Sequence, residues 1–196
     1  MKLVIASNNA KKRQEIAAIL KSQGFTLVPV DETIAVEVVE DGDTFAANAE
    51  KKARAFATAN GCAAVADDSG LCVDALDGAP GLYSARFAGD HGDDAANNAL
   101  LLQKLQGVSD RQAHFCCHIA LILDDGRLVT ADGQVAGKIL DQMDGTEGFG
   151  YDPLFYCDDL DKTFARADHR EKARVSHRGR ALQQLQQQLK RGVSHD

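Results

Sequence analysis

The sequence predicts an α/β protein with a mixed β-sheet flanked by helices. In the first half of the chain, short apolar runs typical of buried strands alternate with segments whose apolar residues recur at helical spacing. In the second half, two strand-like runs are joined by Asp124-Asp125-Gly126, a turn sequence typical of a β-hairpin. Strand–helix alternation favours parallel pairing and a hairpin is antiparallel, so the sheet should contain both orientations.

The chain begins with an expected buried strand at residues 2–6, followed by polar residues and a helix through Gln23, with Gly24 as its stop. A second strand is expected at 25–30. Asp43 or Thr44 can cap the next helix.

Gly61 ends that helix, and a short apolar strand is expected at 62–66. We interpret Asp67-Asp68-Ser69-Gly70 as the end of this strand and a turn, after which residues 71–73 continue it.

The later elements follow from the same signals of periodicity, caps and turns. They are a loop at 77–81, a helix from Asp93 or Asp94 to Gly107, hairpin strands at 114–123 and 127–130, a glycine-rich loop at 145–150, a strand at 154–157 and a helix at 178–190. No repeat, low-complexity linker or domain boundary is evident, so we expect one domain over residues 1–196.

Composition and charge exclude several classes of protein. The 196 residues suffice for one well-buried core, and no apolar run reaches the ~18 residues needed to span a bilayer. The apolar start is too short for a signal peptide, which makes a cytoplasmic protein the default. A net charge of −7 argues against a nucleic-acid polymer as partner.

The charges are unevenly distributed. Basic residues gather between Lys162 and Arg180, and acidic residues form groups at 37–43 and 67–77. Brought together by the fold, these groups would make a site for a metal and a polyphosphate. The alternative is a solvated surface with salt bridges, which charge alone favours.

Five cysteines and six histidines show no metal-site or disulfide spacing, since there is no C-x-x-C pair. We expect buried, reduced thiols. His114 and His118 could share a strand face, but two histidines without a third ligand do not make a metal site, so we expect structural roles.

Three segments carry candidate chemistry. Ser7-Asn8-Asn9-Ala10-Lys11-Lys12 places backbone N–H groups and lysines at a helix N-terminus, which suits an anion, although Ser and Asn also cap helices for structural reasons. This segment lacks the Walker pattern. Asp67 and Asp68 offer carboxylates of the kind that hold Mg²⁺ beside substrate phosphates, and the alternative there is an Asx-type turn.

The third segment, Phe149-Gly150-Tyr151-Asp152-Pro153, sets aromatic rings among glycines, where a flat base could stack. The alternative is an aromatic residue at the edge of the core. Further along, Lys172, His177 and Arg178 supply cations and donors, and Arg178 could bind a purine keto oxygen.

Taken together, six stretches in order resemble the inosine triphosphate pyrophosphatase family. They are Ser7–Lys12 with Glu15, 40–45 with Asn48-Ala49 and Lys52-Ala53, 66–71, 78–86, 148–155, and Glu171-Lys172 with 176–182.

The resemblance implies an elongated mixed sheet in two lobes with a central cleft, and a homodimer. It also implies Mg²⁺-dependent hydrolysis of the non-standard purine triphosphates ITP, dITP and XTP to the monophosphate and pyrophosphate. Carried over residue by residue, it assigns three kinds of role. Glu40 and Asp68 are expected to hold Mg²⁺, and Asp68 is also expected to be the catalytic general base. The triphosphate is expected to bind to Ser7, Asn8, Asn9, Ala10, Lys11 and Lys12. The rest of the substrate is expected to contact Ser69, Phe149, Gly150, Tyr151, Asp152, Lys172, His177 and Arg178.

The sequence departs from the family pattern at Asn8, at Met143-Asp144-Gly145 and at residues 164–167. Two other functions stay open. One is a Maf-like enzyme that hydrolyses pyrimidine or modified triphosphates on a similar fold. The other is a nucleotide sensor that has lost catalysis. The presence of the candidate catalytic residues argues against it; these are Lys12, Glu40, Asp67, Asp68 and Lys172.

Overall fold

The computed structural model describes residues 2–22 and 24–192, and its contacts divide the chain into two compact units. Unit 1 comprises Met1–Asp68, Cys117–Gly133 and Arg178–Asp196. Unit 2 comprises Ser69–Cys116 and Gln134–His177. Each boundary falls inside a strand or at the start of a helix, so no linker marks it in the sequence.

Seven strands are present among the described residues: β1 (Lys2–Ile5), β2 (Thr26–Leu27), β3 (Ala63–Val73), β4 (Gln112–Ile122), β5 (Leu128–Ile139), β6 (Phe155–Cys157) and β7 (Lys162–Thr163). The α-helices are α1 (Ala10–Ser22), α2 (Phe45–Asn60), α3 (Asp94–Lys104), α4 (His169–Val175) and α5 (His177–Gly192). Short 3₁₀ turns are η1 (Val30–Glu32), η2 (Asp74–Leu76), η3 (Gly81–Arg86) and η4 (Phe164–Arg166).

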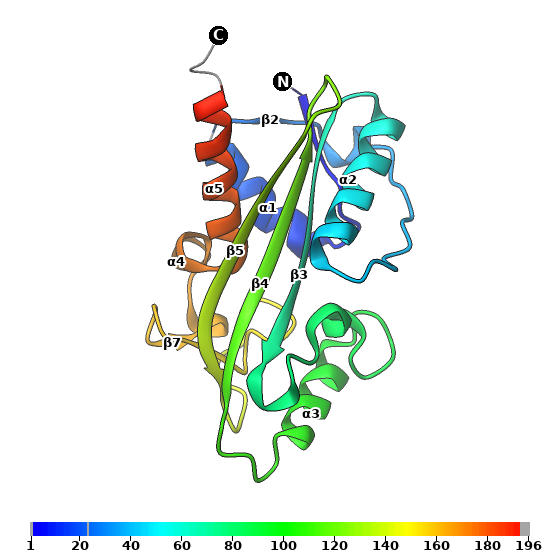
Figure 1. The fold of residues 1–196 in the computed structure, drawn as a ribbon. Coiled ribbons are helices and arrows are strands. Elements are labelled where there is room, and N and C mark those ends of the chain that lie inside the picture. Colours follow the sequence, from blue (N-terminus) through cyan, green and yellow to red (C-terminus); the bar gives the residue numbers. More distant parts are fainter. Residues whose placement is uncertain (1, 23, 193–196) are drawn as a thin grey trace. The chain divides into compact units, whose positions relative to one another are not determined.

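The strands form one open sheet in the order β2-β1-β3-β4-β5-β6-β7, in which β3, β4 and β5 are the long strands (Figure 1). β1 pairs in parallel with both β2 and β3, whereas β6 is antiparallel to β5 and β7. The predicted α/β class with a mixed, helix-flanked sheet is therefore confirmed. No helix among the described residues has both the length and the apolar character needed to cross a membrane.

Unit 1 has its own apolar core between α2 and the β1, β3 and β4 strands. Helical spacing predicts one face of α2 with Phe45, Ala49, Ala53 and Phe56; the last three are buried in this core, whereas Phe45 is half-buried. The strands contribute mainly alanines, with Val4 and Ile122, and alanines lie on both sides of this packing. Small side chains allow the helix to approach the sheet closely.

The core of unit 2 is built around phenylalanine rings, in a chain that contains no tryptophan. The ring centre of Phe115 on β4 lies 4.8 Å from that of Phe155 in an edge-on arrangement, and 6.0 Å from that of Phe164. Such aromatic pairs add stabilisation beyond their buried area. Leu101 and Leu105 from the third helix join the same cluster, as their spacing predicts.

The predicted N-terminal caps agree with the structure at two helices, whereas α3 ends at Lys104, before the predicted stop at Gly107. Thr44, one of the two expected caps, accepts a hydrogen bond from the Ala47 amide, and Asp93 accepts one from the Ala96 amide. Gly61 closes α2 at a φ of 60°, a value that favours glycine. Gln23, the predicted last residue of the first helix, lies outside the described residues.

Some predicted boundaries were wrong. The strand expected at 25–30 is reduced to Thr26–Leu27, because Pro29 has no amide to donate and η1 follows it. The second hairpin strand does not stop at residue 130. It extends to Ile139 through Gly137, where a Cβ would lie 2.2 Å from the Tyr156 carbonyl of β6.

The segment Asp67-Asp68-Ser69-Gly70 corrects another expectation, since it lies within β3 and forms no turn. Gly70 is not among the residues with positive φ. Asp67 and Asp68 are both buried, and carboxylates can occupy a buried strand only where cations or donors compensate them. The partners of these two aspartates therefore indicate where chemistry is concentrated.

Candidate functional site

The loop between β1 and α1 is organised by its own side chains. Asn9 Oδ1 accepts hydrogen bonds from the Lys11 and Lys12 amides at 3.0 and 3.1 Å, so Asn9 caps α1. Ser7 Oγ accepts one from the Asn9 amide, and the Ser7 carbonyl accepts one from Arg13. The loop is thus already shaped around the positive end of a helix, as predicted for an anion site.

Asn8, Ala10 and Lys11 are exposed on this loop, whereas Ser7 and Lys12 are half-buried. Asn8, one of the positions that depart from the family pattern, donates to the Val36 carbonyl at 3.2 Å. This bond ties the loop to the segment before α2.

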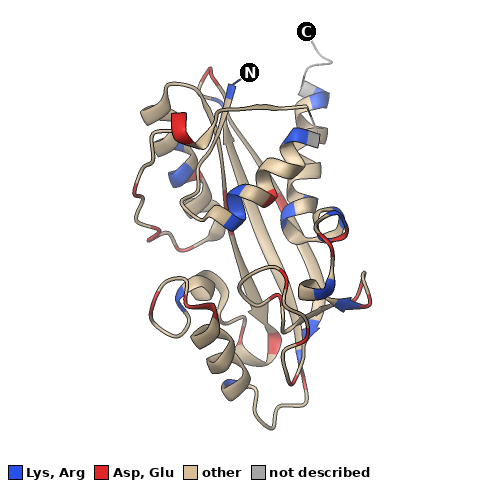
Figure 2. Ribbon diagram, turned by 180° about the vertical axis from the view of Figure 1, so that it is seen from behind, with Lys and Arg blue, Asp and Glu red and all other residues tan. Residues whose placement is uncertain are grey.

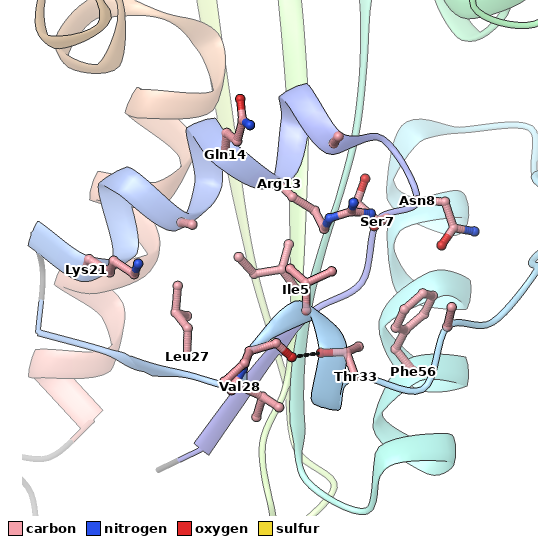
Figure 3. Close-up of a pocket in the computed structure, with 15 residues that line it drawn as sticks. Ile5, Ser7, Asn8, Arg13, Gln14, Lys21, Leu27, Val28, Thr33 and Phe56 are labelled. Carbon is pink, nitrogen blue, oxygen red and sulfur yellow. Dashed lines mark hydrogen bonds between the residues drawn. The ribbon is translucent and has the colours of Figure 1, made fainter.

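A cavity of about 440 Å³ lies beside the loop in unit 1, and Ser7 and Asn8 reach its edge (Figure 3). Its wall is mainly apolar, formed by Ile5, Val28, Phe56 and neighbouring residues. Lys12 and the acidic residues do not line it. The cavity is therefore separate from the charged cluster described next, which holds the predicted metal ligands.

Asp67 is the buried centre of an ion-pair network in unit 1. Its Oδ2 atom accepts from Arg178 Nη2 at 2.7 Å and lies 3.5 Å from Lys12 Nζ, while Arg178 Nη1 pairs with Glu15 at 2.5 Å. Burial alone would raise the pKa of Asp67, but Lys12, Arg178 and Lys52 together hold it well below its usual range. Asp67 is therefore an ionised structural anchor.

Arg178 is 1% exposed, and its guanidinium binds carboxylates from β3 and α1. Figure 2 marks basic residues on both α1 and α5, the two helices that this network joins through β3. The predicted contact between the Arg178 side chain and a purine keto oxygen stays a prediction. The observed pairing supports a role in positioning α1 and Asp67.

Asp68 has different partners from Asp67. Its Oδ2 accepts from Asn48 Nδ2 at 3.0 Å, and its Oδ1 lies 3.8 Å from Lys52 Nζ. Lys52 also pairs with Glu40 at 3.0 Å. Burial raises the pKa of Asp68, against the opposing effect of Lys52 and Lys12. A carboxylate with a raised pKa, held beside other charges, is a candidate general base.

Glu40 and Asp68, the two predicted metal ligands, thus converge on one ammonium group. Glu40 keeps 33% of its side chain exposed and Asp68 keeps 10%. Hard carboxylate oxygens that already gather around a cation fit Mg²⁺, which takes one or two protein carboxylates together with water and phosphate oxygens.

Asn48 is itself positioned by a close backbone contact. Its Oδ1 accepts from the Gly42 amide at 2.8 Å, and a Cβ on Gly42 would lie only 2.7 Å from that oxygen. Glycine is therefore needed at position 42 to keep Asn48 directed at Asp68.

In unit 2, Asp152 holds the glycine-rich loop. Its Oδ2 accepts from the Phe149 amide at 2.8 Å and from Lys172 Nζ at 2.6 Å. Lys172 Nζ lies 4.8 Å from the centre of the Phe149 ring, a cation–π contact. A Cβ at Gly148 would lie 2.1 Å from Asp152 Oδ2, so this glycine permits the close approach.

The neighbours of these residues are also anchored within unit 2. The Gly150 amide donates to Asp94, and Tyr151 is buried with its hydroxyl donating to the Ser84 carbonyl at 2.9 Å. His177 stacks on Phe115 with ring centres 4.7 Å apart. Ser69 lies half-buried in β3. The structure therefore groups Phe149, Asp152 and Lys172, whereas Tyr151 and His177 pack into the core.

Two segments that depart from the family pattern contact each other. Asp144 forms an ion pair with Arg166, and Gly145 lies against the Ala165 backbone, where a Cβ would be 2.6 Å from it. The Asp144 carbonyl accepts from Thr163 Oγ1. The two departing segments therefore pack against each other within unit 2.

Some site residues were not predicted in their roles. Lys52 and Asn48 were recognised only as parts of a motif, although their spacing of four residues on α2 places both on one helix face. The pairing of Glu15 with Arg178 spans 163 residues and leaves no local signal.

The expectation for the cysteines needs correction. None of the five forms a disulfide, but only Cys117 and Cys157 are fully buried. Cys72, His114 and Cys116 come together in unit 2 with ligand atoms within 4.8 Å of one another. Sequence spacing could not reveal this group because Cys72 comes from a different strand. His114 faces two thiols, in place of the partner His118 considered from the sequence.

Comparison with known proteins places these motifs in context. The chain matches the Ham1 family over residues 3–188. A dITP/XTP pyrophosphatase from Desulforamulus reducens is 52% identical over 198 residues, which cover 100% of this chain and 98% of that relative. A dITP/XTP pyrophosphatase from Clostridium perfringens is 47% identical, covering 96% of this chain and 97% of the relative.

Solved structures agree with this relationship. The Staphylococcus aureus Ham1 protein matches with a TM-score of 0.85 and 41% identity, covering 98% of this chain and 100% of that chain. A HAM1 protein from Coxiella burnetii matches with a TM-score of 0.86 and 38% identity, covering 97% of this chain and 99% of that chain. The resemblance found from the six sequence stretches is thereby confirmed.

Proposed function

This chain belongs to the Ham1 family, and from that membership we propose that it hydrolyses the non-standard purine triphosphates ITP, dITP and XTP. The products are the nucleoside monophosphate and pyrophosphate, and the role is to cleanse the nucleotide pool. The relatives' name, dITP/XTP pyrophosphatase, matches the activity that the sequence predicts. The observation that carries the proposal is the convergence of Asp68 and Glu40 on Lys52 in unit 1.

The proposed metal is Mg²⁺, held by Glu40 and Asp68. When bound, it neutralises part of the triphosphate's negative charge and lowers the repulsion toward an incoming nucleophile. Lys52 pairs with both carboxylates, and Asn48 donates a hydrogen bond to Asp68, so the two proposed ligands are held close together.

Asp68 is the proposed general base. It accepts a proton from the water that attacks the α-phosphorus, and the bond to the bridging oxygen breaks so that pyrophosphate leaves. Burial raises the pKa of Asp68, which moves that pKa toward the pH range in which a general base is most effective. Asp67, whose pKa is lowered, stays ionised and keeps Lys12 and Arg178 in place.

Ser7–Lys12 is the proposed triphosphate loop, with Asn9 and Lys12 as its main contacts. Support comes from the Asn9 cap, which shapes the loop at the helix N-terminus, and from Lys12, which is half-buried against Asp67. A lysine whose ammonium is held by a buried carboxylate is pre-organised for an anionic ligand.

The proposed base-recognition group comprises Phe149 for stacking, with Asp152, Lys172 and His177 around it and Ser69, Gly150 and Tyr151 as further contacts. A 6-keto purine offers an acceptor where adenine offers a donor, so a cationic donor favours inosine and xanthosine. A substrate that leaves a buried hydrogen-bond donor of the site without an acceptor loses ~1–3 kcal/mol of binding free energy.

We also propose a homodimer that works in the cytoplasm. Both proposals rest on the family relationship and on the proposed role in the nucleotide pool.

Pyrophosphate release from ITP, XTP, dITP, GTP, ATP and UTP, measured in parallel with and without Mg²⁺, tests the function. We expect rapid, Mg²⁺-dependent release from the inosine and xanthosine substrates. Release mainly from UTP would favour the Maf-like alternative. Binding of ITP without release would favour the catalytically inactive sensor.

A further inference from the structure

Unit 2 contains a cluster of soft metal ligands, Cys72, His114 and Cys116, and none of the three was assigned a role in the proposed function. Cys72 lies on β3, and His114 and Cys116 lie two residues apart on β4, so both β4 side chains point to the same face of the strand. The burial pattern of β4 agrees, because its even-numbered positions from His114 to His118 are half-exposed between buried neighbours. The three side chains therefore gather on an accessible face.

From this geometry we propose that Cys72, His114 and Cys116 bind a thiophilic divalent cation, with Zn²⁺ the best fit. Two thiolates and one imidazole are a common ligand set for Zn²⁺ and a poor one for Mg²⁺, which prefers oxygen. The site is therefore independent of the proposed catalytic metal in both chemistry and residues.

The spacing of the ligand atoms suits a tetrahedral ion after a small closure. Their greatest separation is 4.8 Å or less, whereas ligands sharing one Zn²⁺ lie about 3.5–3.8 Å apart, given bond lengths near 2.0–2.3 Å. Side-chain rotation can supply the difference of about 1 Å without moving the strands.

Asp74 is a carboxylate that lies next to His114 of this cluster. Its Oδ1 lies 3.7 Å from His114 Nδ1, and more than half of its side chain is exposed. A carboxylate beside a ligating histidine orients the ring.

The two thiols come from adjacent strands, Cys72 from β3 and Cys116 from β4. Metal binding displaces the thiol protons to solvent and ties β3 to β4 inside unit 2.

The test uses untagged, full-length protein purified without chelators, so that no histidine tag supplies ligands. Metal content by mass spectrometry should give about one Zn²⁺ per chain in the wild type. Cys72→Ser, Cys116→Ser and His114→Ala should each lose it. Cys62→Ser, a half-buried cysteine in unit 1, should retain it and serves as the matched control.

A second measurement covers variants that fail to fold. Titration of the metal-free wild type with Co²⁺ should produce a thiolate-to-metal charge-transfer band that saturates at one equivalent, and added Zn²⁺ should abolish it and raise Tm. Absence of the band overturns the proposal. So does equal zinc content in Cys62→Ser and Cys72→Ser, or a Cys72–Cys116 disulfide in place of bound metal.

Discussion

Both units bury a lysine–aspartate pair in their candidate groups, but the charge balance differs. In unit 2, Asp152 pairs with Lys172 at 2.6 Å, and Lys172 lies over the rings of Phe149 and Phe164. In unit 1, the ion pairs described above join four carboxylates (Glu15, Glu40, Asp67 and Asp68) to three cations (Lys12, Lys52 and Arg178), so within these pairs the carboxylates outnumber the cations by one.

The excess charge in unit 1 resides where Asp68 and Glu40 share Lys52. A cluster with unbalanced negative charge attracts a divalent cation, whereas a balanced pair next to an aromatic ring suits a neutral base. The proposal therefore assigns lysine–aspartate pairs to chemistry in unit 1 and to base recognition in unit 2.

The largest expected effect comes from removing the proposed base. Asp68→Asn keeps the side-chain volume but cannot accept the water's proton, so kcat for ITP should fall by about 10²–10⁴-fold. Pyrophosphate release at saturating substrate measures this. Asp41→Asn, a nearby carboxamide substitution on an exposed loop, is the control and should leave kcat unchanged. Near-normal turnover in Asp68→Asn would refute the assignment.

The second prediction concerns stability in unit 1. Arg178→Met leaves Asp67 buried without its main partner, and loss of one member of a buried pair should lower the free energy of unfolding by roughly 3–5 kcal/mol. Urea denaturation measures this. Lys51→Met, which breaks the exposed pair with Asp41, should have no comparable effect. Equal stability of the two variants would show that the Asp67 network is not an anchor.

The third prediction separates the two units functionally. Phe149→Leu removes an aromatic face, and loss of stacking worth ~1–3 kcal/mol should lower kcat/KM for ITP by roughly 5–150-fold. The Mg²⁺ concentration that gives half-maximal rate should not move, since the ligands of the proposed metal are untouched. A shift in that concentration would contradict the division of roles.

The smallest expected effect tests how Asn48 is held. Gly42→Ala places a Cβ against Asn48 Oδ1 and should weaken the hydrogen bond to Asp68, lowering kcat by roughly 3–10-fold. Asn48→Ala should show a similar loss. The double variant should be no worse than either single one, because both changes act through the same bond. Additive losses would mean that Gly42 acts by another route.

Local signals predicted much of this molecule. The caps at Thr44 and Asp93, the Gly61 stop and the alternating strands and helices all follow from neighbouring residues, and the structure contains them. The six motifs predicted the Ham1 relationship, which the family match confirms. α4 was missed because it is only seven residues long, and its one strong signal is the capping box of Asp168 and Glu171.

Long-range pairing explains the remaining differences. Asp67 and Asp68 looked like the end of a strand because carboxylates disfavour a buried sheet, and only partners distant in sequence make their burial possible. Arg178 reaches Asp67 across 111 residues. Cys72 meets His114 and Cys116 for the same reason, since adjacent strands bring together residues that no motif connects.

The most direct test of the central claim is the Mg²⁺ dependence of pyrophosphate release from ITP in the wild type and in Glu40→Gln, with Glu37→Gln as an exposed control. If Glu40 and Asp68 hold the metal, Glu40→Gln should need several-fold more Mg²⁺ for half-maximal rate, and excess metal should restore much of the activity. Glu37→Gln should follow the wild-type curve. An unchanged Mg²⁺ dependence in Glu40→Gln would contradict the proposed metal site.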